Sequence, residues 1–131
     1  MRRVIYTSQS RLEEKLGELD KLVEQASILN NAVGITGMLW ADGGRFVQVL
    51  EGDEDAVSDT LKRIGNDPRH NGMEIFCDRG VVHRMFGTWG MVRPDEGPQG
   101  TASTAFLVGL VAVNDSPTAK SVYDMLLNSQ V

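Results

Sequence analysis

The chain has 131 residues, of which 18 are acidic and 13 are basic, so its formal net charge is −5 at pH 7. This length suits one domain that buries its own core, and the single cysteine, Cys77, excludes an internal disulfide framework. There is no basic stripe for nucleic acid, no signal peptide and no apolar stretch of membrane-spanning length, so we expect a cytoplasmic protein without nucleic-acid or membrane partners.

The first two predicted elements each present one polar side chain to the expected core. Residues 2–8 alternate as a strand, with Tyr6 on the same face as Val4. Residues 12–30 follow the helical period, and Asn30 ends the stripe of apolar side chains that should be buried. Both residues also have an ordinary explanation, because a tyrosine can fill core space and an asparagine can cap a helix end.

Residues 34–41 and 45–51 are predicted to form a β-hairpin, since two short runs of branched and aromatic residues flank an Asp-Gly-Gly turn. Both faces of the hairpin are largely apolar, so both should be covered by other elements. The exception is Gln48, whose amide lies between two apolar side chains of one face. A buried amide without hydrogen bonds costs about 1–3 kcal/mol, so Gln48 needs a partner.

Residues 53–66 are predicted to form a second amphipathic helix, which ends before Pro68. Three side chains that carry or can carry positive charge lie at or just past its end: Arg63, Arg69 and His70. They could complement the helix dipole or bind an anionic or carbonyl-rich ligand. Two further strands are predicted at residues 73–78 and 85–92, the second with a weaker pattern because it contains two glycines.

This order of elements, βαββαβ with one additional strand, predicts an α+β, ferredoxin-like fold with two helices on one face of the sheet. A turn-rich linker at 94–103 leads to residues 104–113, which fit either a helix or a strand and which we take as a helix, and then to a helix at 118–128. We expect these C-terminal helices to cover the other sheet face. The predicted division is a domain at 1–93 and a C-terminal linker with a helical cap at 94–131.

Enzyme motifs are scarce in this sequence. We find no nucleophile with a neighbouring base and no phosphate-binding glycine loop, and His70, Cys77 and His83 lack metal-ligand spacing. A group of polar and redox-capable side chains is instead predicted to face the layer between sheet and helices: Tyr6, Asn30, Gln48, Trp89 and Met91. Together they suit a flat ligand that forms hydrogen bonds.

Several stretches resemble successive landmarks of the BLUF domain, the blue-light sensor that uses flavin. They are Tyr6 on the first strand, Asn30 at the end of the first helix, Ile35-Thr36-Gly37, F-x-Q-x-L-E-G at 46–52, D-P-R-H at 67–70 and W-G-M at 89–91. The resemblance covers about residues 2–93, and the F-x-Q-x-L-E-G stretch followed by Arg69-His70 is quite specific. It implies a blue-light photoreceptor that is not an enzyme and holds no metal.

The resemblance further implies a non-covalently bound flavin, FAD or else FMN, between the two helices and the sheet. Asn30 would bind the polar edge of the ring, and Gln48 would sit between the ring and the Tyr6 hydroxyl. Other contacts to the ring or its side chain are implied for Ile35, Arg63, Arg69 and His70. Blue light would drive electron and proton transfer from Tyr6, and the Gln48 amide would rotate or tautomerise. Trp89 and Met91 would pass the change to the C-terminal helices.

Two positions depart from the common family pattern. Ala26 stands where a serine is frequent, and Leu29 stands where a polar residue is frequent, so we expect one fewer hydrogen bond to the ring. The tail carries no recognisable output enzyme, and the resemblance is therefore to the short, stand-alone type. Its signal would go to a separate, unidentified signalling protein or through a homo-oligomer.

Two other interpretations compete with the photoreceptor. A ferredoxin-like hydrolase of the acylphosphatase kind could hold an anion with Arg63 or Arg69, but residues 7–10 are not the glycine loop that favours it. An interaction module without flavin would leave Gln48 as a satisfied core amide. Bound flavin would separate the three interpretations.

Overall fold

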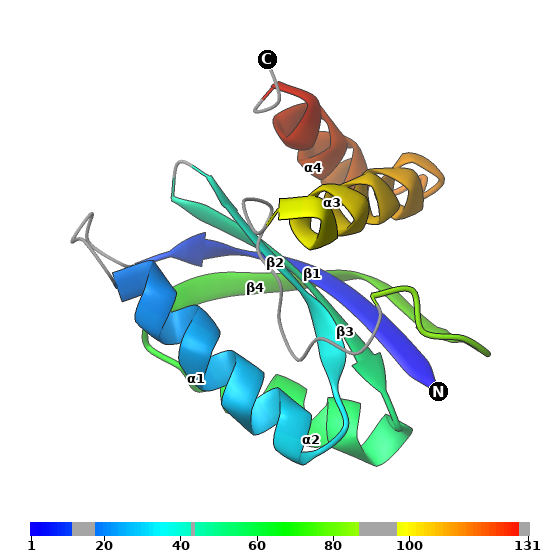
Figure 1. The fold of residues 1–131 in the computed structure, drawn as a ribbon. Helices are drawn as coiled ribbons and strands as arrows, with labels where there is room; N and C mark the ends of the chain where they lie inside the picture. Colours follow the sequence, from blue (N-terminus) through cyan, green and yellow to red (C-terminus); the bar gives the residue numbers. More distant parts are fainter. Residues whose placement is uncertain (12–17, 43, 87–96, 129–131) are drawn as a thin grey trace.

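The computed structural model describes residues 1–11, 18–42, 44–86 and 97–128 (Figure 1). The elements follow in the order β1 (Arg2–Ser10), α1 (Glu18–Ala32), β2 (Thr36–Asp42), β3 (Arg45–Gly52), α2 (Glu54–Gly65), β4 (His70–Gly80), α3 (Gly97–Ala112) and α4 (Pro117–Asn128). The predicted βαββαβ order is confirmed, and residues 104–113 belong largely to a helix. Most of the additional strand predicted at 85–92, with Trp89 and Met91, lies outside the described residues.

The sheet is antiparallel with the strand order β2-β3-β1-β4. Each crossover helix returns the chain to a strand two places away, which is the ferredoxin-like arrangement predicted from the sequence. The register of the two central strands pairs Tyr6 with Gln48 and Arg3 with Glu51. Side chains from β1 and β3 are thereby brought together in two places, three residues apart along each strand.

Helices cover both faces of the sheet, as predicted: α1 and α2 lie on one face and α3 and α4 on the other (Figure 1). The strand residues alternate between two buried clusters. The cluster under α1 and α2 consists of Val4, Val23, Ile35, Leu39, Phe46, Leu50 and Val57. The cluster under α3 and α4 contains Ile5, Met38, Trp40, Val47, Val49, Phe86, Leu107, Val111, Ala119, Val122 and Leu126. No helix in the described ranges is long and apolar enough to cross a bilayer.

The hairpin of β2 and β3 requires a glycine at position 37. A Cβ atom built there would lie 1.9 Å from the carbonyl oxygen of Val49, and this contact is with backbone, which cannot move aside as a side chain can. The two strands approach each other too closely for any side chain at this point.

β4 departs from the strict alternation predicted for residues 73–78. Its pairing with β1 shifts between Ile5 and Tyr6, so that Phe76 is an extra residue, and both Phe76 and Cys77 pack toward the cluster under α3 and α4. The carbonyl oxygen of Phe76 accepts a hydrogen bond of 2.9 Å from the Asn114 side chain, in the turn between α3 and α4. The β-bulge explains why the period-two prediction fails here.

The turn-rich linker predicted at 94–103 is wrong for residues 97–103, which form the start of α3. Pro98 is compatible with this helix because the first helical turn needs no N–H donor from it. Gly97, Pro98 and Gly100, which contributed to the linker prediction, therefore lie in the first turn of a helix.

Candidate functional site

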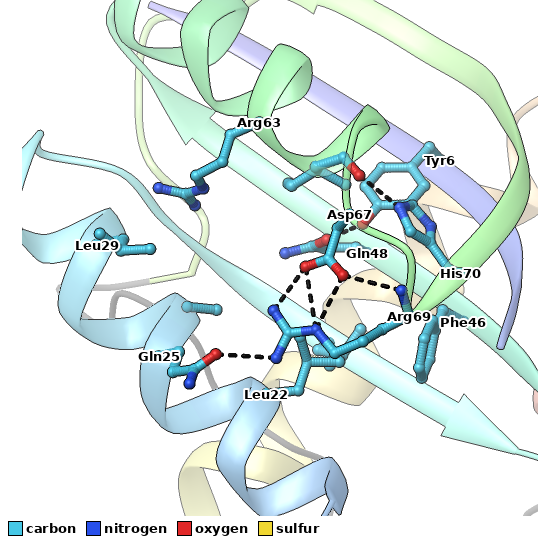
Figure 2. A pocket seen from close by; sticks show the side chains of 13 residues that line it. Tyr6, Leu22, Gln25, Leu29, Phe46, Gln48, Arg63, Asp67, Arg69 and His70 are labelled. Atoms are coloured by element: carbon cyan, nitrogen blue, oxygen red, sulfur yellow. Dashed lines mark hydrogen bonds and ion pairs between the residues drawn. The ribbon is translucent and has the colours of Figure 1, made fainter. Parts of the chain in front are cut away.

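A cavity of about 180 Å³ lies between the sheet, α1, α2 and the loop that leads into β4 (Figure 2). Its apolar walls come from both layers: Leu22, Ala26 and Leu29 of α1, Leu39 and Phe46 of the hairpin, and Ile64 of α2. Its polar lining consists of Tyr6, Gln25, Gln48, Arg63, Asp67, Arg69 and His70. Apolar walls with a few converging polar groups are typical of a small-molecule site.

Tyr6 and Gln48 meet in this cavity from neighbouring strands. The Tyr6 hydroxyl donates a hydrogen bond to Oε1 of Gln48, and both side chains are buried, with exposed fractions of 3% and 5%. Burial raises the pKa of Tyr6 above its ordinary value, the charge of Asp67 adds to this rise and Arg63 opposes it. The phenol is therefore protonated at neutral pH and is held in place as a donor to Gln48.

Asn30 lies beside the cavity at the last turn of α1 and is fully buried. Its Oδ1 atom accepts a hydrogen bond of 3.0 Å from Arg63 Nη2, and Arg63 itself lines the cavity from α2. The Asn30 carbonyl oxygen also accepts from the backbone N–H of Ile35 at 2.9 Å. The Ile35 side chain packs in the core cluster of α1 and α2 and is not among the residues that line the cavity.

Arg69 connects two sides of the cavity. It forms an ion pair with Asp67, and its Nη1 donates a hydrogen bond of 2.9 Å to Oε1 of Gln25 on α1 (Figure 2). The hydrogen bond from Arg69 lowers the pKa of Asp67, and the same bond raises the pKa of Arg69. The ion pair therefore stays charged at neutral pH.

The hydrogen-bond partners of His70 select one tautomer of its neutral ring. Its Nε2 lies 2.6 Å from the carbonyl oxygen of Ile64, and its Nδ1 lies 2.8 Å from the Ser8 hydroxyl. Because a carbonyl oxygen can only accept, Nε2 must be the protonated nitrogen and Nδ1 accepts from Ser8. The ring stands near Tyr6, with centroids 6.1 Å apart.

The cavity thus brings together Tyr6, Gln48, Arg63, Arg69 and His70, with Asn30 bonded to Arg63 at its side. Ala26 and Leu29, the two positions that depart from the family pattern, both line the cavity. Trp89 and Met91 lie outside the described residues.

Sequence reasoning assigned no site role to Gln25 and included Asp67 only as part of the D-P-R-H stretch at 67–70. Asp67 could have been found, because an acidic residue two positions before an arginine in a loop is placed to pair with it. For Gln25 the sequence offers no signal, since it falls on the polar face of α1 like an ordinary surface residue.

The side chains present fit a flavin. The buried amides of Asn30 and Gln48 match a flat ring with alternating donors and acceptors at its edge, and the apolar side chains of the helices match its faces. Such a ring would also cover the half-exposed Leu29 at the cavity wall. In the described residues, by contrast, no group of three or more possible metal ligands occurs.

Comparisons with known proteins agree with this fit. Residues 1–92 match the family described as sensors of blue-light using FAD. The blue light- and temperature-regulated antirepressor BluF of Escherichia coli (strain K12) is 37% identical over 89 residues, which are 67% of this chain and 22% of that protein. This chain spans only 9% to 22% of the length of the curated relatives it matches.

Solved structures extend the likeness to the fold. The dark-state structure of the BLUF protein BlrB is 27% identical with a TM-score of 0.66, and the match covers 78% of this chain and 89% of that one. Klebsiella pneumoniae BlrP1, solved with FMN and cyclic diGMP, is 26% identical with a TM-score of 0.70, and the match covers 98% of this chain and 35% of that one. This chain is therefore a member of the BLUF family, the flavin-binding sensors of blue light.

Proposed function

We propose that this protein senses blue light through a flavin bound in the cavity, with Gln48 as the switch and Tyr6 as the electron donor. The observation that carries the proposal is the buried hydrogen bond from Tyr6 to Gln48 in the cavity between the helices and the sheet. It supports a switch because it joins a redox-active phenol to a side chain with two different hydrogen-bonding ends.

The ring would be held by polar groups at one edge and apolar groups on its faces. Asn30 would bind the ring's polar edge, and Arg63, already bonded to Asn30, would add a positive charge there. Arg69, His70 and Ile35 remain predicted contacts to the ring or its side chain. We propose FAD as the cofactor, since the family is described by FAD, although FMN would present the same ring to these residues.

A bound flavin would supply the absorption of blue light and a transient acceptor for one electron and one proton, which return to Tyr6 in the dark. Tyr6 gives up both, and it can do so because its hydroxyl is protonated and directed at Gln48. Gln48 then rotates or tautomerises, and the end of its amide that faces Tyr6 changes between acceptor and donor. A carboxylate has no donor end when ionised, and a hydrocarbon has neither end, so neither could store these two patterns as an amide can.

The altered Gln48 would shift the population of two arrangements of the chain beyond β4. Trp89 and Met91 are predicted to carry this change to α3 and α4. The receiver would be a separate signalling protein or a second copy of this chain.

The test is an absorption spectrum of the purified protein, recorded in darkness and again after blue illumination. We expect a structured flavin band that moves slightly to longer wavelength in light and returns in the dark. A colourless protein that does not take up added FAD or FMN would refute the proposal. It would favour the hydrolase or the interaction module instead.

A further inference from the structure

Glu51 is a fully buried carboxylate that the proposed photochemistry does not use. It lies three residues after Gln48 on β3, on the opposite sheet face from the cavity. Its two oxygens accept hydrogen bonds from Thr36 Oγ1 at 3.1 Å, from the backbone N–H groups of Met85 and Phe86 at 3.0 and 2.8 Å, and from Arg3 Nε at 3.2 Å. A buried charge needs such a set of partners to be tolerated.

These bonds attach the segment after β4 to three strands of the sheet. Besides the two N–H groups held by Glu51, the carbonyl oxygen of His83 accepts from Arg3 Nη2 at 3.3 Å. Arg84 donates from Nη1 to Thr36 Oγ1 at 2.9 Å and to the Glu51 carbonyl oxygen at 3.1 Å. Each residue from 83 to 86 is therefore bonded to β1, β2 or β3, and Glu51 takes part in the bonds of three of these four residues.

Phe86 links this attachment to the C-terminal helices. Its N–H is bound by Glu51, while its ring is fully buried in the cluster under α3 and α4. The ring also meets Phe106 of α3 edge to face, with centroids 6.2 Å apart and an interplanar angle of 89°. One residue thus joins β3 through its backbone and α3 through its side chain.

The residues that hold the segment 83–86 include Arg3 and Glu51, which lie on the same two strands as Tyr6 and Gln48. Tyr6 pairs with Gln48 and Arg3 pairs with Glu51 in the register of β1 and β3. A rearrangement at the first pair that moves β1 relative to β3 must act on the second pair, because Glu51 divides its bonds between Arg3 of β1 and the segment 85–86.

We propose that Glu51 is a positioning residue that transmits the state of Gln48 to α3 through the backbone and ring of Phe86. This inference rests on the proposed function. It adds a route through Glu51 and Phe86, which both precede Trp89 in the chain. A purely structural Glu51 would stabilise the fold equally in darkness and in light. A transmitting Glu51 is required for the difference between the two states.

The test uses the full chain with bound FAD and two measurements on the same sample: the absorption change on illumination, and hydrogen exchange of the α3 and α4 amides in darkness and in light. In the unsubstituted protein we expect a red shift and a change of about threefold or more in exchange rates of α3 amides. Glu51→Gln, which keeps the shape but replaces one accepting oxygen by a donor, should retain the red shift and lose most of the exchange change.

Asp78→Asn is the matched control. It also removes a carboxylate paired with an arginine of β1, Arg2, but that pair is partly exposed and makes no bond to residues 83–86. We expect this variant to keep both the red shift and the exchange change.

Phe106→Leu tests the same route without touching the buried charge, and it decides the question if Glu51→Gln does not fold. We expect its red shift to persist and the light-induced exchange change in α3 to fall. A normal exchange change in either folded variant, a loss of the red shift in Glu51→Gln, or a photocycling parent protein without any change in α3 would overturn the inference. A parent protein with no photocycle would instead overturn the proposed function on which it rests.

Discussion

The bond between Tyr6 and Gln48 can be measured as a coupling between two substitutions. Gln48→Leu leaves the buried Tyr6 hydroxyl without this acceptor, and Tyr6→Phe leaves the Gln48 oxygen without this donor. Each single change should lower the free energy of unfolding by about 1–3 kcal/mol, because a buried polar group loses this hydrogen bond. The double variant removes both polar groups together, so its loss should be smaller than the sum of the two single losses by about 1 kcal/mol or more.

The assay is urea unfolding of the flavin-free protein for the parent, the two single variants and the double variant. Arg2→Gln with Asp78→Asn provides a comparison pair, because its ion pair is partly exposed and should show a coupling of about 0.2–1 kcal/mol. The double variant's loss of unfolding free energy could instead equal the sum of the two single losses to within about 0.3–0.5 kcal/mol. That result would show that Tyr6 and Gln48 do not depend on each other, and the switch would lose its structural basis.

The same variants separate stability from photochemistry once FAD is bound. Gln48→Leu should bind FAD but show no red shift, since leucine cannot exchange a donor for an acceptor. Tyr6→Phe should bind FAD and lose the reversible photoproduct, since it lacks the phenol that supplies the electron and the proton. A photocycle of full size in either variant would refute the role given to that side chain.

Three further predictions concern other described residues. Asn30→Ala should weaken FAD binding by about 1–2 kcal/mol, or roughly five- to thirtyfold, whereas the exposed Asn31→Ala should leave it unchanged; fluorescence titration of both variants measures this, and equal affinities would contradict the role of Asn30. Gly37→Ala should destabilise the fold by about 3 kcal/mol or more, because its Cβ would meet a backbone oxygen of β3 at 1.9 Å, and an unchanged urea midpoint would refute this clash. The pKa of Asp67 is lowered by Arg69, so its carboxylate stabilises the fold above its unfolded pKa of about 3.9 and this contribution is lost as the pH falls through the lower folded value. Asp67→Asn should therefore flatten the loss of stability below about pH 4, as read from urea midpoints at several pH values, and an unchanged acid limb would exclude this contribution.

The sequence allowed most of the architecture to be predicted, because the periodicity of apolar residues sets which face of each element is buried. Both faces of the hairpin at 34–51 are covered, as predicted, since Leu39, Phe46 and Leu50 pack in one cluster and Met38 and Val49 in the other. The prediction failed where the pattern of hydrophobic residues does not decide the outcome. The bulge at Phe76 depends on pairing with β1, and the start of α3 depends on the permissive first turn at Pro98.

The candidate site was predictable to the extent that its residues interrupt an apolar pattern. Gln48 among strand hydrophobes and Asn30 at the end of a buried helix stripe both indicated a ligand. Gln25 lies on the polar face of its helix, where a functional side chain looks like any solvated one, whereas Glu51 belongs to the same apolar strand as Gln48. Only the folded arrangement shows that Glu51, a charged residue near the end of a strand, is completely buried.

The bulge in β4 also bears on how copies of this protein can meet. β4 is an edge strand of the described sheet, and an unbroken edge would offer its free backbone groups to a strand of another molecule. The extra residue at Phe76 interrupts the regular spacing of those groups, and Asn114 already occupies the Phe76 carbonyl oxygen. Exposed charges at Glu74, Asp78 and Arg79 line the same strand. Growth of the described sheet into aggregates through this edge is therefore disfavoured.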